Sequence, residues 1–154
     1  MASITTFLTF ERGGKDAIEL YVSLFENSEL HHMMVMPGTD QLLHASFSLA
    51  GREFMAMDGG EEFTFGLGTS LFVNCADQAE VDRYWDALTA TGGEPGRCGW
   101  LKDRFGVSWQ IIPQRLGELM SDPDQARAMK VREAMLSMGK IDIEGLQRAH
   151  DQAG

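Results

Sequence analysis

The chain has 154 residues, of which 44% are hydrophobic and 23% are charged, and its net charge is −10. This size and composition are typical of one globular domain with a core of its own. Because a strongly acidic surface repels a phosphate backbone, we expect no nucleic-acid partner. No apolar run approaches the roughly 20 residues that a membrane-spanning helix needs, so we expect no membrane partner either.

The N-terminus and the cysteines indicate the compartment. The stretch MASITTFLTF lacks the basic region of a signal peptide and begins a strand pattern at once. Two cysteines, Cys75 and Cys98, without a secretion signal are typical of free thiols in a reducing environment. We therefore expect a cytoplasmic protein without a disulfide.

The first part of the chain predicts one helix among four strands. Ala17, Leu20, Tyr21 and Leu24 recur with helical spacing, which predicts a helix over residues 16–25. Strands are expected over residues 4–10, 30–36, 42–49 and 53–57, separated by Gly- and Pro-containing turns.

The second part repeats this order. A strand is expected over 69–75, a helix over 79–90, one or two short strands within 94–102, and a last strand over 107–112. The chain therefore reads as strand–helix–strand–strand–strand twice, which we call module one (4–60) and module two (69–113).

A helical tail over residues 114–154 follows the modules. Asp122-Pro123 favours a helix start, with the helix running to about Met138, and Asp142 favours one more short helix. Met129, Ala134, Met135 and Met138 form an apolar stripe on the longer helix. We expect this stripe to pack on its own domain or on a twin subunit.

Alternation along the strands sorts their side chains into two faces. On the more apolar face, which the helices should cover, we place Leu8, Phe10, Leu43, Ala45, Phe47, Leu49, Phe54, Ala56, Leu71, Val73, Cys75, Trp109 and Ile111. The opposite face, which we call the cup face, carries Thr5, Phe7, Thr9, His44, Ser46, Ser48, Met55, Met57, Ser70, Phe72, Asn74, Ser108, Gln110 and Ile112.

The cup face has almost no charge and mixes hydroxyl, thioether, aromatic and amide groups. That mixture is typical of a surface that holds a small molecule with a few placed polar groups. The alternative is a sheet face that the tail or a partner chain simply covers.

Four stretches, ELYVSLFENSEL, FMAMDGG, FVNCADQAEVDRYWDAL and CGWLKDRFGVSWQIIP, resemble the PhnB-like branch of the vicinal oxygen chelate superfamily. This superfamily includes glyoxalase I and the bleomycin resistance proteins, and the branch often carries the name demethylubiquinone methyltransferase. The resemblance covers residues 4–148. It implies an α+β fold in which two βαβββ modules form a cupped mixed sheet followed by C-terminal helices, as a single domain over 1–154.

The resemblance also locates the metal ligands of metal-using members, which lie in the first and last strands of each module. Here those places fall on Thr5 or Thr6, Met55 or Met57, Ser70, and Gln110, which replaces a glutamate. These side chains supply no negative charge to a divalent ion. We therefore expect no metal and no cofactor.

The methyltransferase name gains no support from the residues. Enzymes that use S-adenosylmethionine typically place a Gly-rich turn between a strand and a helix of a doubly wound sheet. Here Gly66-Leu67-Gly68 leads into a strand, and Gly59-Gly60 forms a turn between the modules.

Three functions follow from these observations. The first is metal-independent binding of a small, partly apolar ligand, with contacts from Phe7, Thr9, His44, Met57, Phe72, Asn74, Trp100 and Gln110. The second is an enzyme without metal, of the lyase or isomerase type, in which His44 is the base and Asn74 and Gln110 stabilise an oxyanion. The third is assembly, with a vestigial cup and an important tail.

For the assembly itself, we expect a homodimer whose interface uses the module edges and the tail, as is common for two-module members of the superfamily.

Two further local expectations concern charge and thiols. Lys102, Asp103 and Arg104 are interpreted as a solvated turn, and Cys98 as an exposed loop cysteine.

Overall fold

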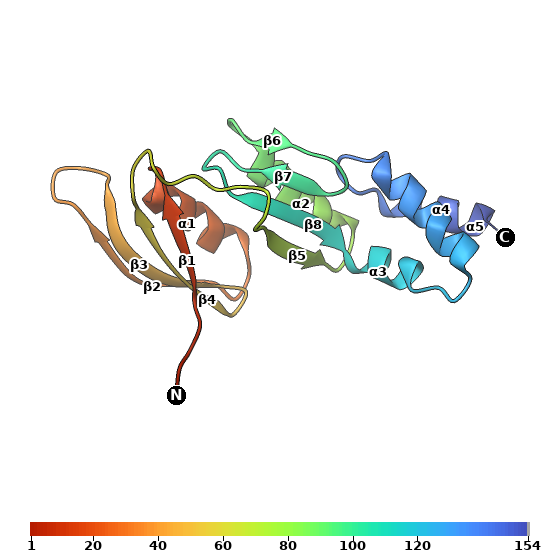
Figure 1. Cartoon of the computed structure of the whole chain (residues 1–154), viewed down its shortest axis with the longest axis horizontal. Coiled ribbons are helices and arrows are strands. Elements are labelled where there is room, and N and C mark those ends of the chain that lie inside the picture. The colour runs from red at the N-terminus through yellow and green to blue at the C-terminus, as the bar shows by residue number, and fades with distance from the viewer. Residues whose placement is uncertain (154) are drawn as a thin grey trace. The chain divides into compact units, whose positions relative to one another are not determined.

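The structure, a computed structural model, describes residues 1–153. The chain divides into two compact units, Met1–Phe65 and Gly66–Gly154. The first unit contains module one, and the second contains module two and the tail (Figure 1). The repeated βαβββ order predicted from the sequence is confirmed.

Module one is a four-stranded mixed sheet with one helix on its back. Its elements are β1 (Thr6–Phe10), α1 (Gly14–Leu24), β2 (Glu29–Val35), β3 (Leu42–Leu49) and β4 (Arg52–Asp58). The strand order is β1-β4-β3-β2, with β1 parallel to β4 and the other pairs antiparallel. Helix α1 lies behind the strands in Figure 1. Phe10, Ile18, Tyr21 and Phe47 are fully buried between the two layers.

A buried carboxylate joins the two layers of module one. Asp58, at the end of β4, accepts hydrogen bonds from the backbone N–H groups of Gly14 and Leu42, each at 2.9 Å. The residue before α1 is Gly13, which has no side chain that could cap the helix. Asp58 of β4 therefore caps the N-terminal end of α1. A Cβ at position 14 would lie only 2.7 Å from Oδ1 of Asp58, which is why glycine stands there.

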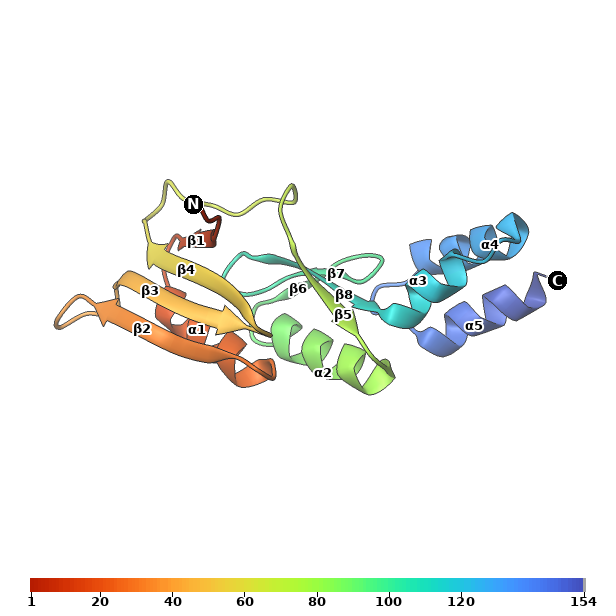
Figure 2. The same ribbon diagram turned by 90° about the horizontal axis from the view of Figure 1, so that it is seen from below.

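Module two repeats the arrangement with shorter strands. Its elements are β5 (Leu71–Cys75), α2 (Gln78–Thr89), β6 (Glu94–Pro95), β7 (Trp100–Lys102) and β8 (Ser108–Pro113). The strand order is β5-β8-β7-β6, with β5 parallel to β8. Figure 2 shows α2 along one face of this sheet. Asp77 caps the start of the helix by accepting from the Glu80 N–H, and the Glu80 side chain accepts from the N–H of Ala76, one residue before the cap.

The turn before β8 differs from the sequence-based expectation. Asp103 is not solvated but 3% exposed. One carboxylate oxygen accepts from the N–H groups of Phe105 and Val107, and the other accepts from Nε1 of Trp109 at 2.9 Å. The prediction of a solvated turn was wrong for Asp103, because it assumed that charged side chains in loops are exposed. This carboxylate instead holds the turn together and anchors the Trp109 indole on the helix-covered face.

The tail forms three helices: α3 (Gln114–Met120), α4 (Gln125–Leu136) and α5 (Ile143–Gln152). The sequence reading missed α3 and placed the cap of α4 at Asp122, whereas Asp124 caps it by accepting from the Ala126 N–H. Helix α5 begins directly after Asp142, as predicted, but the Asp142 side chain accepts no capping hydrogen bond.

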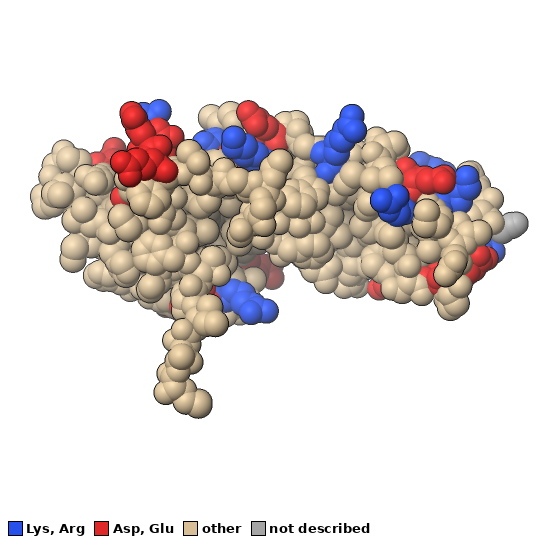
Figure 3. Space-filling model, in the orientation of Figure 1, with Lys and Arg blue, Asp and Glu red and all other residues tan. Residues whose placement is uncertain are grey.

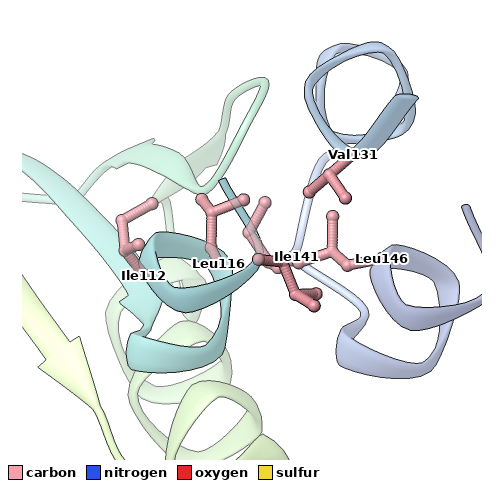
Figure 4. Close-up of a cluster of buried hydrophobic side chains, with 6 residues drawn as sticks. Ile112, Leu116, Val131, Ile141 and Leu146 are labelled. Carbon is pink, nitrogen blue, oxygen red and sulfur yellow. The ribbon is translucent and has the colours of Figure 1, made fainter. Parts of the chain in front are cut away.

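The three tail helices share a core with the end of β8. Its buried members are Ile112, Leu116, Leu119, Val131, Ile141 and Leu146, and all of these except Leu119 are labelled in Figure 4. Met135 and Met138 pack against this cluster, whereas Met129 is 51% exposed. The apolar stripe of the tail therefore packs largely on its own unit, which was one of the two expected outcomes.

Hydrogen bonds fasten the tail to module two. The Gln78 side chain donates to the carbonyl of Ile141 and accepts from the N–H of Ile143. The N–H groups of Cys98 and Gly99 donate to the carbonyls of Met138 and Gly139. Since Ile112 belongs to the cup face of β8, the tail covers that end of the face.

The predicted face assignment holds with one correction. Leu42, not Leu43, packs under α1: it is fully buried, and a Cβ on Gly14 would lie 2.9 Å from its side chain. The reason is a register shift between β2 and β3, which pairs Met34 with His44 but Val35 with Leu42.

None of the helices within residues 1–153 is long and apolar enough to cross a membrane.

Candidate functional site

The cup face of module two carries a row of two aromatic side chains with an amide between them. On β8, Gln110 is the Cα partner of Phe72 on β5 and of Trp100 on β7. Directly opposed residues of neighbouring strands point to the same face, so the three side chains form a row across the sheet. Phe72 is 59% exposed, which leaves one aromatic ring available for stacking.

A hydrogen bond holds the amide of this row in place. Nε2 of Gln110 donates to Oγ of Ser70 at 2.9 Å, in a partly buried position. Ser70 precedes β5, and Ser108, on the same face of β8, donates to the carbonyl of Gly66. Asn74 lies further along β5 opposite Ile112, where the tail begins. The polar groups of this face are therefore neutral, and one of their hydrogen bonds, from Gln110 to Ser70, joins two of them.

The structure thus brings together two of the positions at which metal-using relatives keep ligands, Ser70 and Gln110. A hydroxyl and an amide, however, give a divalent ion no charged donor. In module one, the other positions fall on Thr5 or Thr6, both exposed, and on Met55 or Met57, the Cα partners of Phe7 and Thr9. Residues 1–153 hold no group of three His, Cys, Asp or Glu side chains that could bind a metal ion. These residues do not fit the metal site of the superfamily.

The cup face of module one is arranged around His44. The His44 ring centroid lies 6.4 Å from that of Phe7 and 6.1 Å from that of His32, both in tilted arrangements. Among residues 1–153, no carboxylate orients the His44 ring through a hydrogen bond. A role of His44 as a general base therefore stays a prediction, because the ring lacks the partner that usually fixes its tautomer.

Sequence reasoning missed the contribution of β2 to this face. His32 is the Cα partner of Ser46, and Met34 is the partner of His44, so both lie on the cup face. His31 reaches Glu53 of β4 at 3.1 Å. The two-residue spacing of His32 and Met34 in the predicted strand could have revealed a shared face, had the pairing of β2 with β3 been considered.

Charged side chains lie toward the margins of the face that Figure 3 shows, and the strands of each sheet are mostly covered by uncharged atoms.

The chain's two cysteines lie away from the cup faces. Cys75 is fully buried under α2, and burial raises the pKa of its thiol to about 12. Cys98 is partly exposed, in a left-handed backbone conformation with φ of 58°.

Comparison with known proteins agrees with this geometry. A family model described as 3-demethylubiquinone-9 3-methyltransferase matches residues 2–112 and so ends where the tail begins. No curated protein matches the chain.

Among solved structures, the chain resembles a putative 3-demethylubiquinone-9 3-methyltransferase, a PhnB protein from Bacillus cereus. The two are 33% identical with a TM-score of 0.67, over 73% of this chain and 99% of that one. Protein PA1353 from Pseudomonas aeruginosa is 23% identical, with a TM-score of 0.60 over 73% and 98% of the two chains.

A more distant structure shares the fold. The fosfomycin resistance protein FosX from Listeria monocytogenes, solved with Mn(II) and sulfate, is 17% identical with a TM-score of 0.50, over 71% and 89% of the two chains. Together with the two βαβββ modules, these matches place the fold with the glyoxalase and bleomycin resistance proteins. The chain therefore belongs to the PhnB-like family described as 3-demethylubiquinone-9 3-methyltransferase, within the vicinal oxygen chelate superfamily.

Proposed function

We propose that this protein binds a small, partly apolar molecule on its cup faces and does so without a divalent metal. The observation that carries the proposal is the Phe72–Gln110–Trp100 row, in which Ser70 holds the Gln110 amide. Where a metal-using relative keeps a carboxylate, this chain presents a hydrogen-bonding amide between two aromatic side chains.

The row supplies the two kinds of contact that such a ligand needs. Phe72 and Trp100 offer ring surface for a flat apolar part. Gln110 and Asn74 offer neutral amide groups for a hydroxyl or carbonyl of the ligand. The cup face of module one carries a separate set of candidate contacts, Phe7, Thr9, His44 and Met57, and none of these is a carboxylate.

The methyltransferase in the family's description is not part of the proposal. The two sheets have the orders β1-β4-β3-β2 and β5-β8-β7-β6, and each contains antiparallel pairs. Sites for S-adenosylmethionine are typically built at the carboxyl ends of a doubly wound parallel sheet, where a Gly-rich turn leads into a helix. The contacts proposed above serve binding of a neutral molecule, whether or not turnover follows.

Isotope-edited NMR on EDTA-treated protein tests the proposal. A panel of neutral bicyclic aromatic alcohols and ketones is titrated in, and the indole N–H of Trp100 and the side-chain amides of Gln110 and Asn74 are followed. We expect at least one probe to shift these signals, with the indole signals of the buried residues Trp85 and Trp109 as internal controls.

The variant Phe72→Ala should weaken the binding without unfolding the protein, because Phe72 is more than half exposed. Leu67→Ala is a matched control, since Leu67 is also exposed, at 76%, but lies outside the row. The proposal is wrong if no probe shifts the row, or if shifts occur only after Mn²⁺, Ni²⁺ or Zn²⁺ is added.

A further inference from the structure

Three side chains on the cup face of module one carry metal-binding donor groups, and only one of them, His44, belongs to the proposed ligand contacts. Met34 on β2 is the Cα partner of His44 on β3, so the thioether and the imidazole stand on the same face of adjacent strands. The ring of His32, two residues before Met34, lies 6.1 Å from that of His44, centroid to centroid. Two imidazoles and one thioether are thus neighbours on an open surface.

The spacing of the two rings matches that of imidazoles that share one metal ion. A metal at about 2.0–2.1 Å from a ring nitrogen lies roughly 3.2 Å from the ring centroid, so two rings on one ion have centroids up to about 6.4 Å apart. His32 and His44, with centroids 6.1 Å apart and ring planes tilted by 42°, lie within this limit, so one ion can bridge them once a nitrogen of each ring, neither of which is buried, is turned toward the other. Met34 is 51% exposed, so its sulfur is free to approach such an ion from the side.

The donor set selects the metal. Thioether sulfur is a soft ligand that favours copper(I), whereas Mg²⁺, Ca²⁺ and Mn²⁺ favour oxygen donors. Structural zinc sites take four ligands from Cys, His, Asp and Glu, and residues 1–153 bring no three such side chains together in a metal-binding group. We propose that His32, His44 and Met34 bind one copper(I) ion on the cup face of module one.

Two neighbours of this group provide matched controls. His31 is adjacent to His32 in sequence, but its ring nitrogen pairs with Glu53 at 3.1 Å. Met36 is 39% exposed and lies just beyond the end of β2, outside the His44 pairing. If copper bound only to a surface rich in histidine and methionine, substitution of a control residue would weaken binding as much as substitution of a site residue. A defined site is weakened only by substitution of its own residues.

The test is an anaerobic titration of the full chain with copper(I) in competition with bicinchoninate, a coloured chelator. We expect one ion per chain. His32→Gln and Met34→Leu should each weaken binding by at least the roughly 10- to 100-fold that the loss of a supporting group around a metal ligand costs. His31→Gln and Met36→Leu should change it less than about twofold, within the scatter of surface substitutions. Circular dichroism checks that each variant is folded.

Three results would overturn the proposal: no copper(I) held against the chelator, equal losses in the site and control variants, or zinc(II) bound more tightly with the same pattern of losses. The test is independent of the proposed function. His32 and Met34 lie outside the proposed ligand contacts, so their variants should leave binding of the aromatic probes unchanged. His44 belongs to both sets and is therefore left unaltered.

Discussion

Substitution of Trp109 tests which face of β8 is covered by the helix and which is the cup face. The Trp109 side chain is 2% exposed, and a buried Trp removes about 150–250 Å² from water. At about 25 cal/mol per Å², that area corresponds to roughly 4–6 kcal/mol, which is an upper estimate because unfolded chains already bury part of it. We expect Trp109→Ala to lower the free energy of unfolding by about 3–5 kcal/mol, as large core truncations do.

The lost indole N–H adds to this cost, because one oxygen of the buried Asp103 carboxylate loses its Trp109 donor. Asp103 would keep two backbone donors, from Phe105 and Val107, on its other oxygen. The matched control is Gln110→Ala, one residue along the strand and on the opposite face. It loses one partly buried hydrogen bond to Ser70 and should cost only about 0.5–1.5 kcal/mol.

Urea unfolding followed by far-UV circular dichroism measures both variants, since fluorescence would change with the number of Trp residues. The slope against urea should stay constant while the midpoint falls. Equal costs for Trp109→Ala and Gln110→Ala, or a larger cost for Gln110→Ala, would refute the face assignment. Every residue placed on the cup face of module two would then have to be reassigned.

Further predictions concern metal content, thiols, acid stability and assembly. Elemental analysis after mild dialysis should find no stoichiometric Ni, Zn, Mn or Fe, and about one such ion per chain or per dimer would contradict the reading of the four ligand positions. Iodoacetamide at pH 8 should label Cys98 and spare Cys75 until urea is added, because burial raises the Cys75 pKa to about 12; labelling of both thiols in the native state would disagree. The Asp124 N–H and, secondarily, the His150 ring lower the pKa of Asp122, so its contribution to tail stability is present above the ordinary Asp pKa of about 4 and disappears as pH falls through the lowered value. Asp122→Asn should therefore flatten the acid limb of stability measured by urea unfolding between pH 6 and pH 3, and an unchanged limb would count against this linkage. Light scattering should show a dimer at tens of micromolar, and Met129→Glu should weaken it if the tail takes part; a monomeric wild-type chain would exclude the dimer.

Much of the fold was predictable because its signals are local. The apolar spacing of Val81, Tyr84, Trp85 and Leu88 predicts α2 to within one residue at each end, and all four side chains are buried. Strand β3 matches its predicted range of 42–49 at both ends. The repeat of the βαβββ order then predicts the fold class without any knowledge of how the strands pair.

The errors arose where distant residues decide the local structure. Leu42 replaces Leu43 under α1 because a register shift with β2 changes which residue faces the helix. Asp103 is buried because it accepts three hydrogen bonds, one of them from a side chain six residues away. Helix α3 was missed because its apolar residues, such as Leu116, pack on tail helices that come later in the chain.

The candidate site was predictable in part for the same reason. Alternation along β5 and β8 puts Phe72 and Gln110 on one face, and strand pairing shows that they are neighbours. The bond between Gln110 and Ser70 joins residues 40 positions apart, and only the folded sheet brings them together. That His32 lies on the cup face of module one became visible only once β2 was paired with β3.

A high-resolution crystal structure of the protein as purified, with no ligand added and with data collected at metal absorption edges, tests the central claim most directly. We expect density for an organic molecule against Phe72 and the Gln110 amide, with no anomalous peak between Ser70 and Gln110. A divalent metal bound by these two residues would contradict it.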